Sequence, residues 1–130
     1  MLLDPNNPRL HSHKDDRIPE DQYEKSEVQK ATSDKMLQKR FNVAELIEGI
    51  EINGFIPVDH IFVRKYRNSK YFLVLEGNRR VTAVKTIIAR IEESREAGQD
   101  IDEALANQLS EITVKQINDS VELLFIIFNN

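Results

Sequence analysis

The spacing of hydrophobic residues predicts two amphipathic helices in the middle of the chain. Apolar residues three and four positions apart predict a helix over Val43–Ile52, capped by Asn42 and ended by the pair Asn53-Gly54. A longer helix is predicted over residues 79–96. Its apolar stripe, which we expect to be buried, consists of Val81, Val84, Ile87, Ile88 and Ile91.

Short runs rich in β-branched and aromatic residues predict strands on either side of the long helix. They lie near His60–Arg64, at Tyr71–Leu75 and at Ile112–Ile117. The turn-forming pair Asn68-Ser69 joins the first two runs, so we expect them to form a β-hairpin. A short helix is expected over Asp102–Leu109.

The N-terminal part of the chain is more polar and predicts less regular structure. Residues 1–17 are rich in Pro, Asn, Asp and His and are expected to be extended or to form turns. Residues 18–41 are expected to form a helical extension from Pro19 to about Arg40, interrupted at Thr32-Ser33-Asp34. Its candidate inward contacts are Tyr23, Val28, Ala31, Met36 and Leu37. Residues 42–130 would then form the core of a single domain.

The last residues are strongly apolar and have no polar tail. A final helix is predicted to begin at Asp119 or Ser120 and to include the run Leu123–Phe128. Such a helix would expose a sizeable apolar patch. We therefore expect the chain to be a fragment of a longer protein or to pack against another part of one.

Length and composition limit the classes of protein to consider. With 130 residues, 40% of them hydrophobic, the chain is long enough for one domain with its own core. It contains no cysteine, which excludes a disulfide, a thiolate metal site and a sulfur nucleophile. Leu123–Phe128 is too short to span a bilayer, and no signal-peptide pattern opens the chain. We therefore expect a cytoplasmic protein.

Positive charge is concentrated in one segment of an otherwise acidic chain. The net charge is −4, which argues against a surface that binds nucleic acid all over. Between Arg64 and Arg90, eight basic residues face a single acid, Glu76, which gives a local net charge of +7, while the rest of the chain carries −11. This distribution is typical of a site for a discrete anion, although solvated strand ends and helix faces would give the same count.

Two adjacent arginines stand at the predicted start of the long helix. After Glu76-Gly77 ends the strand, Asn78 is a favoured N-cap, and Arg79 and Arg80 occupy the first helical positions. The helix dipole is positive at this end, so each arginine costs about 0.3–1 kcal/mol unless an anion joins it. Free amides, a glycine and two guanidinium groups together favour a bound phosphate. The alternative is that each arginine pairs with an acid such as Glu76.

The order of these segments resembles the N-terminal domain of the ParB/sulfiredoxin-like superfamily. The resemblance runs from Leu3 to Lys85 and comprises DPNNPRL, a helix ending in INGF, then DHIFVR and YFLVLEGNRRVTAVK. The last segment is similar to the family's motif of a strand, Gly-x-Arg-Arg and a helix. The fold that this resemblance implies is α+β, with a small mixed β-sheet flanked by helices.

The resemblance also implies that the chain binds a nucleotide or phosphate at this motif. ParB-like domains bind CTP, with the motif on the triphosphate and Mg²⁺ bridging its oxygens. Relatives bind ATP, are described as nucleases, or phosphorylate small molecules. Gly77, Arg79 and Arg80 match the glycine and the arginine pair of the motif, and Arg9 lies where such domains often supply another residue to the pocket.

The chain departs from the family pattern in three respects. Asn78 stands where many ParB motifs have an acid, and the nearest carboxylate is Glu76, on the other side of Gly77. Asn129-Asn130 could match the start of an Asn-containing phosphate or metal motif, but the arginine that would follow is absent from this chain. The reductase chemistry of sulfiredoxin needs a cysteine and is excluded here.

Three functional hypotheses are open from the sequence. The first is a nucleotide-binding module of a larger DNA-associated protein, which holds the phosphates of CTP or ATP, with Mg²⁺, through Arg9, Gly77, Asn78, Arg79 and Arg80. Glu76 is then the candidate metal or water contact. The second is a Mg²⁺-dependent nuclease or phosphoryl-transfer enzyme with Glu76 as the catalytic group. The third is a protein-interaction module with a vestigial anion site, which the run Leu123–Phe128 favours.

The expected partners and the remaining polar residues add little to these hypotheses. No helix-turn-helix with a basic reading helix is visible, so DNA would be contacted through regions outside this chain, and a homodimer is left open. His11 and His13 have the spacing of strand residues that point the same way toward a metal, but imidazoles in such a polar segment are more often solvated. His60 is expected to be structural.

Overall fold

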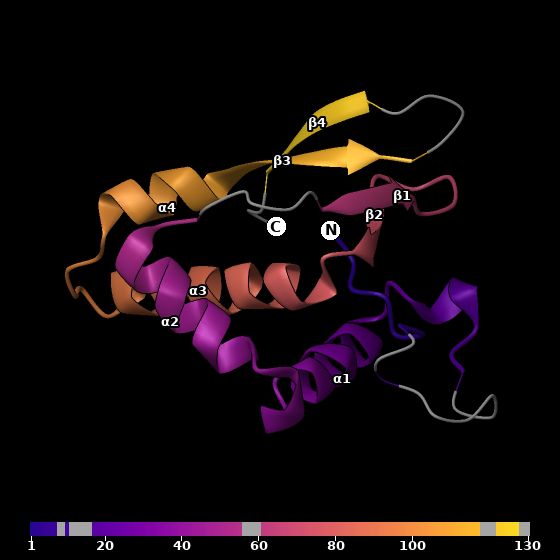
Figure 1. Ribbon diagram of the computed structural model, residues 1–130, viewed down its shortest axis with the longest axis horizontal. Coiled ribbons are helices and arrows are strands. Elements are labelled where there is room, and N and C mark those ends of the chain that lie inside the picture. The colour runs from indigo at the N-terminus through magenta and orange to yellow at the C-terminus, as the bar shows by residue number, and fades with distance from the viewer. Residues whose placement is uncertain (8–9, 11–16, 56–60, 118–121, 128–130) are drawn as a thin grey trace.

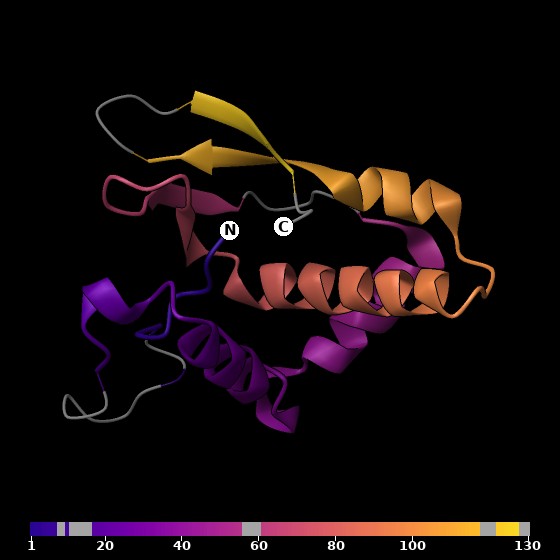
Figure 2. The ribbon, with the colours of Figure 1, turned by 180° about the vertical axis from the view of Figure 1, so that it is seen from behind.

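The part of the chain that the structure describes contains four α-helices and a four-stranded mixed sheet, which confirms the α+β class (Figure 1). The computed structural model describes residues 1–7, 10, 17–55, 61–117 and 122–127. Helices α1–α3 lie on one side of the sheet, and α4 lies at one end of it, in both views (Figures 1 and 2). Among the helices in these ranges, none is both long enough and apolar enough to cross a membrane.

The sheet has the strand order β2-β1-β3-β4. The predicted hairpin is confirmed: β1 (Phe62–Lys65) pairs antiparallel with β2 (Phe72–Glu76). The predicted strand at 112–117 is also confirmed, as β3 (Glu111–Gln116), which runs parallel to β1. The last strand, β4, spans Glu122–Ile127 and pairs antiparallel with β3.

After residue 42, the helices follow the hydrophobic pattern closely. Helix α2 spans Val43–Asn53, α3 spans Asn78–Glu96 and α4 spans Glu103–Ser110, each within two residues of its predicted bounds. The expected stop after α2 is confirmed by Gly54, whose φ of 80° lies in the left-handed region. At the start of α4, the carboxylate of Asp102 accepts a hydrogen bond from the amide of Leu105.

The helical extension differs from its prediction. A short 3₁₀ helix, η2 (Glu20–Gln22), comes first, and α1 spans only Ser26–Met36 before a second 3₁₀ helix, η3 (Lys39–Phe41). The expected break at Thr32-Ser33-Asp34 is wrong. Thr32 is buried and its hydroxyl donates a hydrogen bond to the carbonyl of Val28 at 2.8 Å, so its polar group is satisfied within the helix. Tyr23 and Met36 are buried as expected, whereas Ala31 and Leu37 are exposed.

The predicted final helix is wrong as well. Glu122–Ile127 forms β4, in which Glu122 lies opposite Gln116 and Ile127 lies opposite Glu111. A short apolar run has no period that separates a helix from a buried strand. Here the neighbouring strand β3 supplies backbone partners, and the predicted starting residues Asp119 and Ser120 lie outside the described residues.

The first residues of the chain lie along β2. Leu2 forms a parallel bridge with Leu73, with its amide 2.7 Å from the carbonyl oxygen of Phe72. The side-chain amide of Gln29, on α1, bonds both backbone groups of Leu3, at 2.8 and 2.9 Å. The start of the chain is therefore fixed between the sheet and α1.

Helix α3 is central to the core. It contacts α1, α2, α4 and β2, and Figure 2 shows it between the sheet and α1. Of its predicted apolar stripe, Val81, Val84 and Ile87 are buried, and Ile88 and Ile91 are partly buried against the same core. The start of this helix is therefore held on several sides, which sets the positions of Arg79 and Arg80.

Candidate functional site: a cavity between α2 and α3

Gly77 makes the turn from β2 into α3. Its φ is 101°, a conformation that residues with a side chain rarely adopt, and it is the N-cap of α3. A Cβ at this position would lie 3.0 Å from Cγ1 of Ile61. Backbone geometry and packing thus account for this glycine. The prediction that Asn78 is the N-cap is wrong, because Asn78 is the first residue of the helix.

The side chain of Asn78 is used inside the protein. Asn78 is buried, its Oδ1 accepts a hydrogen bond from the amide of Asp4 at 2.9 Å, and its Nδ2 donates to the carbonyl of Val74 at 3.2 Å. These bonds connect α3, β2 and the start of the chain. Asn78 is not among the residues that line the cavity described below, nor is Gly77.

Arg79 joins the start of α3 to the segment before α2. Its Nε donates a hydrogen bond of 2.7 Å to the carbonyl oxygen of Phe41, the last residue of η3. The two terminal amino groups of the guanidinium carry further donors. Arg79 therefore has a structural contact and also lines the cavity between the two helices.

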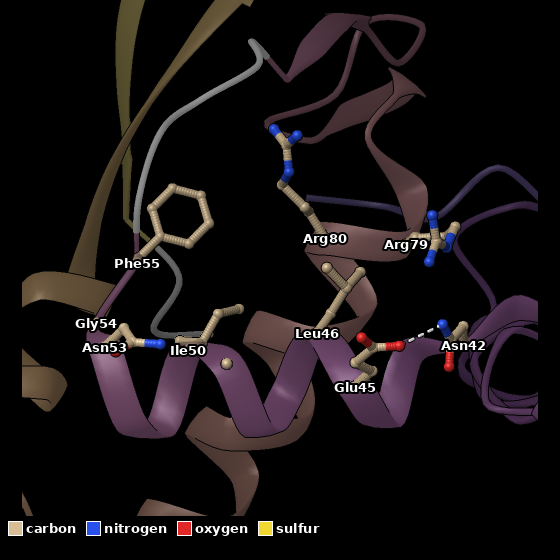
Figure 3. A pocket seen from close by; sticks show the side chains of 10 residues that line it. Asn42, Glu45, Leu46, Ile50, Asn53, Gly54, Phe55, Arg79 and Arg80 are labelled. Atoms are coloured by element: carbon tan, nitrogen blue, oxygen red, sulfur yellow. Dashed lines mark hydrogen bonds between the residues drawn. The ribbon is translucent and has the colours of Figure 1, made fainter.

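A cavity of about 440 Å³ lies between α2 and the start of α3 (Figure 3). Its volume is within the range of about 300–1,000 Å³ that is typical of small-molecule sites. We call it the α2–α3 cavity. It is lined by Asn42, Glu45, Leu46, Gly49, Ile50, Asn53, Gly54, Phe55, Arg79 and Arg80.

The two arginines direct their guanidinium groups to different places. Figure 3 shows Arg79 near Asn42, at the start of α2, and Arg80 beside Leu46, between Phe55 and Arg79, with its guanidinium group directed away from α2. Both side chains are half-buried. The two guanidinium groups therefore point away from each other. They would contact separate groups of a ligand.

Helix α2 supplies the rest of the cavity wall. Leu46 and Ile50 form an apolar surface, Asn53 adds an amide, and Glu45 accepts a hydrogen bond from Asn42 at 2.6 Å (Figure 3). Sequence reasoning treated this helix as a packing element only. Gly49 was the available signal, because an isolated glycine in a helix often has a packing or functional reason, and space is open beside it.

Gln108 fixes the position of Phe55 from outside the cavity. Its side-chain oxygen accepts a hydrogen bond from the Phe55 amide at 2.9 Å, and its nitrogen donates to the Phe55 carbonyl at 2.8 Å. Gln108 belongs to α4, so this contact ties α4 to the cavity wall. Nothing in the local sequence predicts this pairing.

The other predicted site residues do not meet at the cavity. Glu76 ends β2, is exposed and does not line the cavity, and within the described part of the chain it forms no ion pair with either arginine. Arg9 lies outside the described residues, as do the pair Asn129-Asn130 and all three histidines. In the ranges that the structure describes, no three His, Asp or Glu side chains cluster as metal ligands.

Comparisons of the chain with protein-family models, with curated proteins and with solved structures returned no match. The geometry of the α2–α3 cavity is therefore the basis for a functional proposal.

Proposed function

We propose that the α2–α3 cavity binds a nucleotide, CTP or ATP, and that the chain is a ParB-like module of a larger DNA-associated protein. The observation that supports this proposal is the meeting of Arg79 and Arg80 with an apolar wall around a cavity of about 440 Å³. A nucleotide has both kinds of surface, a charged phosphate chain and a flat, largely apolar base. Contacts with DNA would come chiefly from regions outside this chain.

The two arginines would hold the phosphates. Guanidinium groups form strong charge-assisted hydrogen bonds with phosphate oxygens, and the start of α3 adds the positive end of a helix dipole. Because the guanidinium groups of Arg79 and Arg80 point in different directions (Figure 3), they would contact different phosphate groups or a phosphate and the sugar. Leu46, Ile50 and Phe55 would form the surface beside the base.

Any Mg²⁺ would be held mainly by the nucleotide. Mg²⁺ keeps several waters and is commonly bound through one or two carboxylates together with phosphate oxygens. Glu45 is the single carboxylate among the described residues that line the cavity, which suits such a shared site. We do not propose hydrolysis or phosphoryl transfer, because Glu76, the residue on which that hypothesis depended, does not line the cavity.

The binding proposal predicts a specific effect of Arg80→Ala. We expect nucleotide affinity to fall about tenfold or more, because a hydrogen bond to a charged group contributes about 1.5–3 kcal/mol. Isothermal titration with CTP and with ATP, each with Mg²⁺, measures the dissociation constants. Inorganic triphosphate, titrated in parallel, separates the phosphate contribution from that of the base.

Arg90→Ala is the matched control. Arg90 lies on the same helix, is exposed and pairs with Glu51 at 3.4 Å, so its loss changes the net charge equally without touching the cavity. Nucleotide affinity should be unchanged in this variant. Absence of binding by the intact protein, or equal loss in both variants, would contradict the proposal.

A further inference from the structure

The basic residues between Arg64 and Arg90 fall into three sets: those that line the cavity, those with a partner elsewhere in the protein, and those near the hairpin turn. Arg79 and Arg80 line the α2–α3 cavity. Arg64 pairs with Glu20 and Arg90 pairs with Glu51, while Lys85 is half-buried and donates a hydrogen bond to the Met1 carbonyl. Three cations are left, one at the end of β1 and two in the turn that follows it. We call Lys65, Arg67 and Lys70 the hairpin cations.

The hairpin cations are exposed and have no acidic partner within the described part of the chain. Lys70 has one recorded contact, with its Nζ 5.5 Å from the centre of the Tyr71 ring. Three positive charges within six residues are therefore accessible to a negatively charged partner. Negative charge that approaches the turn lowers the repulsion among them.

The turn that presents these cations is held firmly. Arg64 pairs with Glu20 and donates to the Lys65 carbonyl at 3.2 Å, and the hydroxyl of Tyr66 donates to the Glu20 carbonyl at 2.6 Å. Tyr66 is buried and its ring stacks on Tyr23, with centroids 5.9 Å apart. The loop therefore needs little ordering on binding, which is the usual advantage of a preorganised site.

The hairpin turn and the cavity are at opposite ends of β2. Helix α3 begins just after β2 ends, whereas the turn lies before β2 starts, at the end of the sheet away from α4 (Figures 1 and 2). A five-residue strand is roughly 16 Å long at the usual rise of 3.2–3.4 Å per residue. A ligand in the cavity therefore does not occupy the turn.

We propose that the hairpin cations bind the sugar-phosphate backbone of a nucleic acid. A polymer with one charge per phosphate can satisfy several cations on a narrow two-stranded turn at once. The rest of the chain is strongly acidic and would repel the same polymer, so the contact would be confined to this end of the molecule. The contact is independent of base sequence and adds a second anion-binding surface beyond the nucleotide cavity.

The test maps the contact by NMR. A 20-base-pair DNA duplex is titrated into the ¹⁵N-labelled protein at low salt, and we expect amide shifts concentrated at residues 65–71. Three neutralised phosphates predict that affinity falls roughly sixfold when the salt concentration doubles. Shifts confined to the start of α3, or no shifts at all, would overturn the proposal.

Two triple variants of equal net charge complete the test. Lys65→Gln, Arg67→Asn, Lys70→Gln should abolish the hairpin shifts and the salt dependence; Asn is chosen because Arg67 has φ 53°. Lys30→Gln, Lys35→Gln, Lys39→Gln, at exposed sites of α1 and η3, should leave both unchanged. If both variants lost the hairpin shifts and the salt dependence equally, net charge alone would explain the binding, and the proposal would be overturned. A poly-Glu peptide that shifts the same amides as strongly as DNA would overturn it in favour of an acidic protein partner.

Discussion

Asn78 is a buried polar residue whose two amide atoms tie together segments that are distant in the sequence. Asn78→Asp should lower the free energy of unfolding by about 1–3 kcal/mol, because the donor to Val74 is lost and a carboxylate is buried beside a carbonyl. Urea denaturation measures this change. The control is Asn68→Asp, at an exposed position in the hairpin turn, and a similar loss there would contradict the explanation.

The sequence places residue 78 at the start of a helix, but it does not reveal what its side chain does. Its acceptor bond joins residues 74 positions apart, and the N-terminal segment must fold back onto β2 before that bond exists. The same holds for Gly77. Local rules predict a turn there, whereas the close approach of Ile61 emerges only when β1 and β2 pair.

Helix α4 affects the cavity without touching it, through the two bonds from Gln108 to the backbone of Phe55. Gln108→Ala should reduce nucleotide affinity less than Arg80→Ala does and should lower the free energy of unfolding by about 1–2 kcal/mol. Gln108→Glu should give an intermediate result, because its carboxylate accepts from the Phe55 amide but cannot donate to the carbonyl.

Titration calorimetry and urea denaturation measure these two effects. Asn107→Ala, at an exposed neighbouring position on α4, is the control and should change neither. If Gln108→Ala lowers stability while affinity per folded molecule stays constant, Gln108 does not position the cavity wall.

Elements with a long, regular pattern could be predicted from the sequence, and the others could not. Helices α2 and α3 each have an apolar stripe over at least three turns, and the hairpin has a clear turn signal. Strand β4 is short and apolar after Glu122, so only its pairing with β3 decides between strand and helix. The cavity depends on which face of α2 meets α3, and the pattern of a single helix does not contain that information.

The stability of the whole molecule should depend on pH through Lys85. Burial lowers the pKa of Lys85 below its ordinary value of 10.5. At a pH below the pKa of Lys85 in both the folded and the unfolded state, Lys85 is charged in both. The folded state then carries the full free-energy cost of burying that charge. Between them the unfolded chain binds more protons, so the free energy of unfolding rises with pH toward 10.5.

Lys85→Met removes this titration. We expect the variant to gain most relative to the original protein at neutral pH, and the difference to shrink as the pH approaches 10.5. Urea denaturation at a series of pH values measures it. Burial also raises the pKa of Tyr23, but Tyr23 is common to both proteins and cancels in the comparison. The Met1 amine does not cancel, because burial and the charge of Lys85 lower its pKa to about 6, and the loss of that charge adds to the gain of the variant at lower pH. A difference that is constant with pH would contradict the prediction.

The contact of Leu2 with β2 has a consequence for how molecules of this protein could assemble. Unpaired strand borders invite pairing between chains, and a sheet with two open borders can add copies without limit and grow into a filament. Here Leu2 occupies part of the β2 border, while β4 lies at the opposite border. Two copies that paired through their β4 strands would therefore form a dimer that does not grow further. If the first residues of the chain were displaced from β2, that border would become available and such dimers could polymerise.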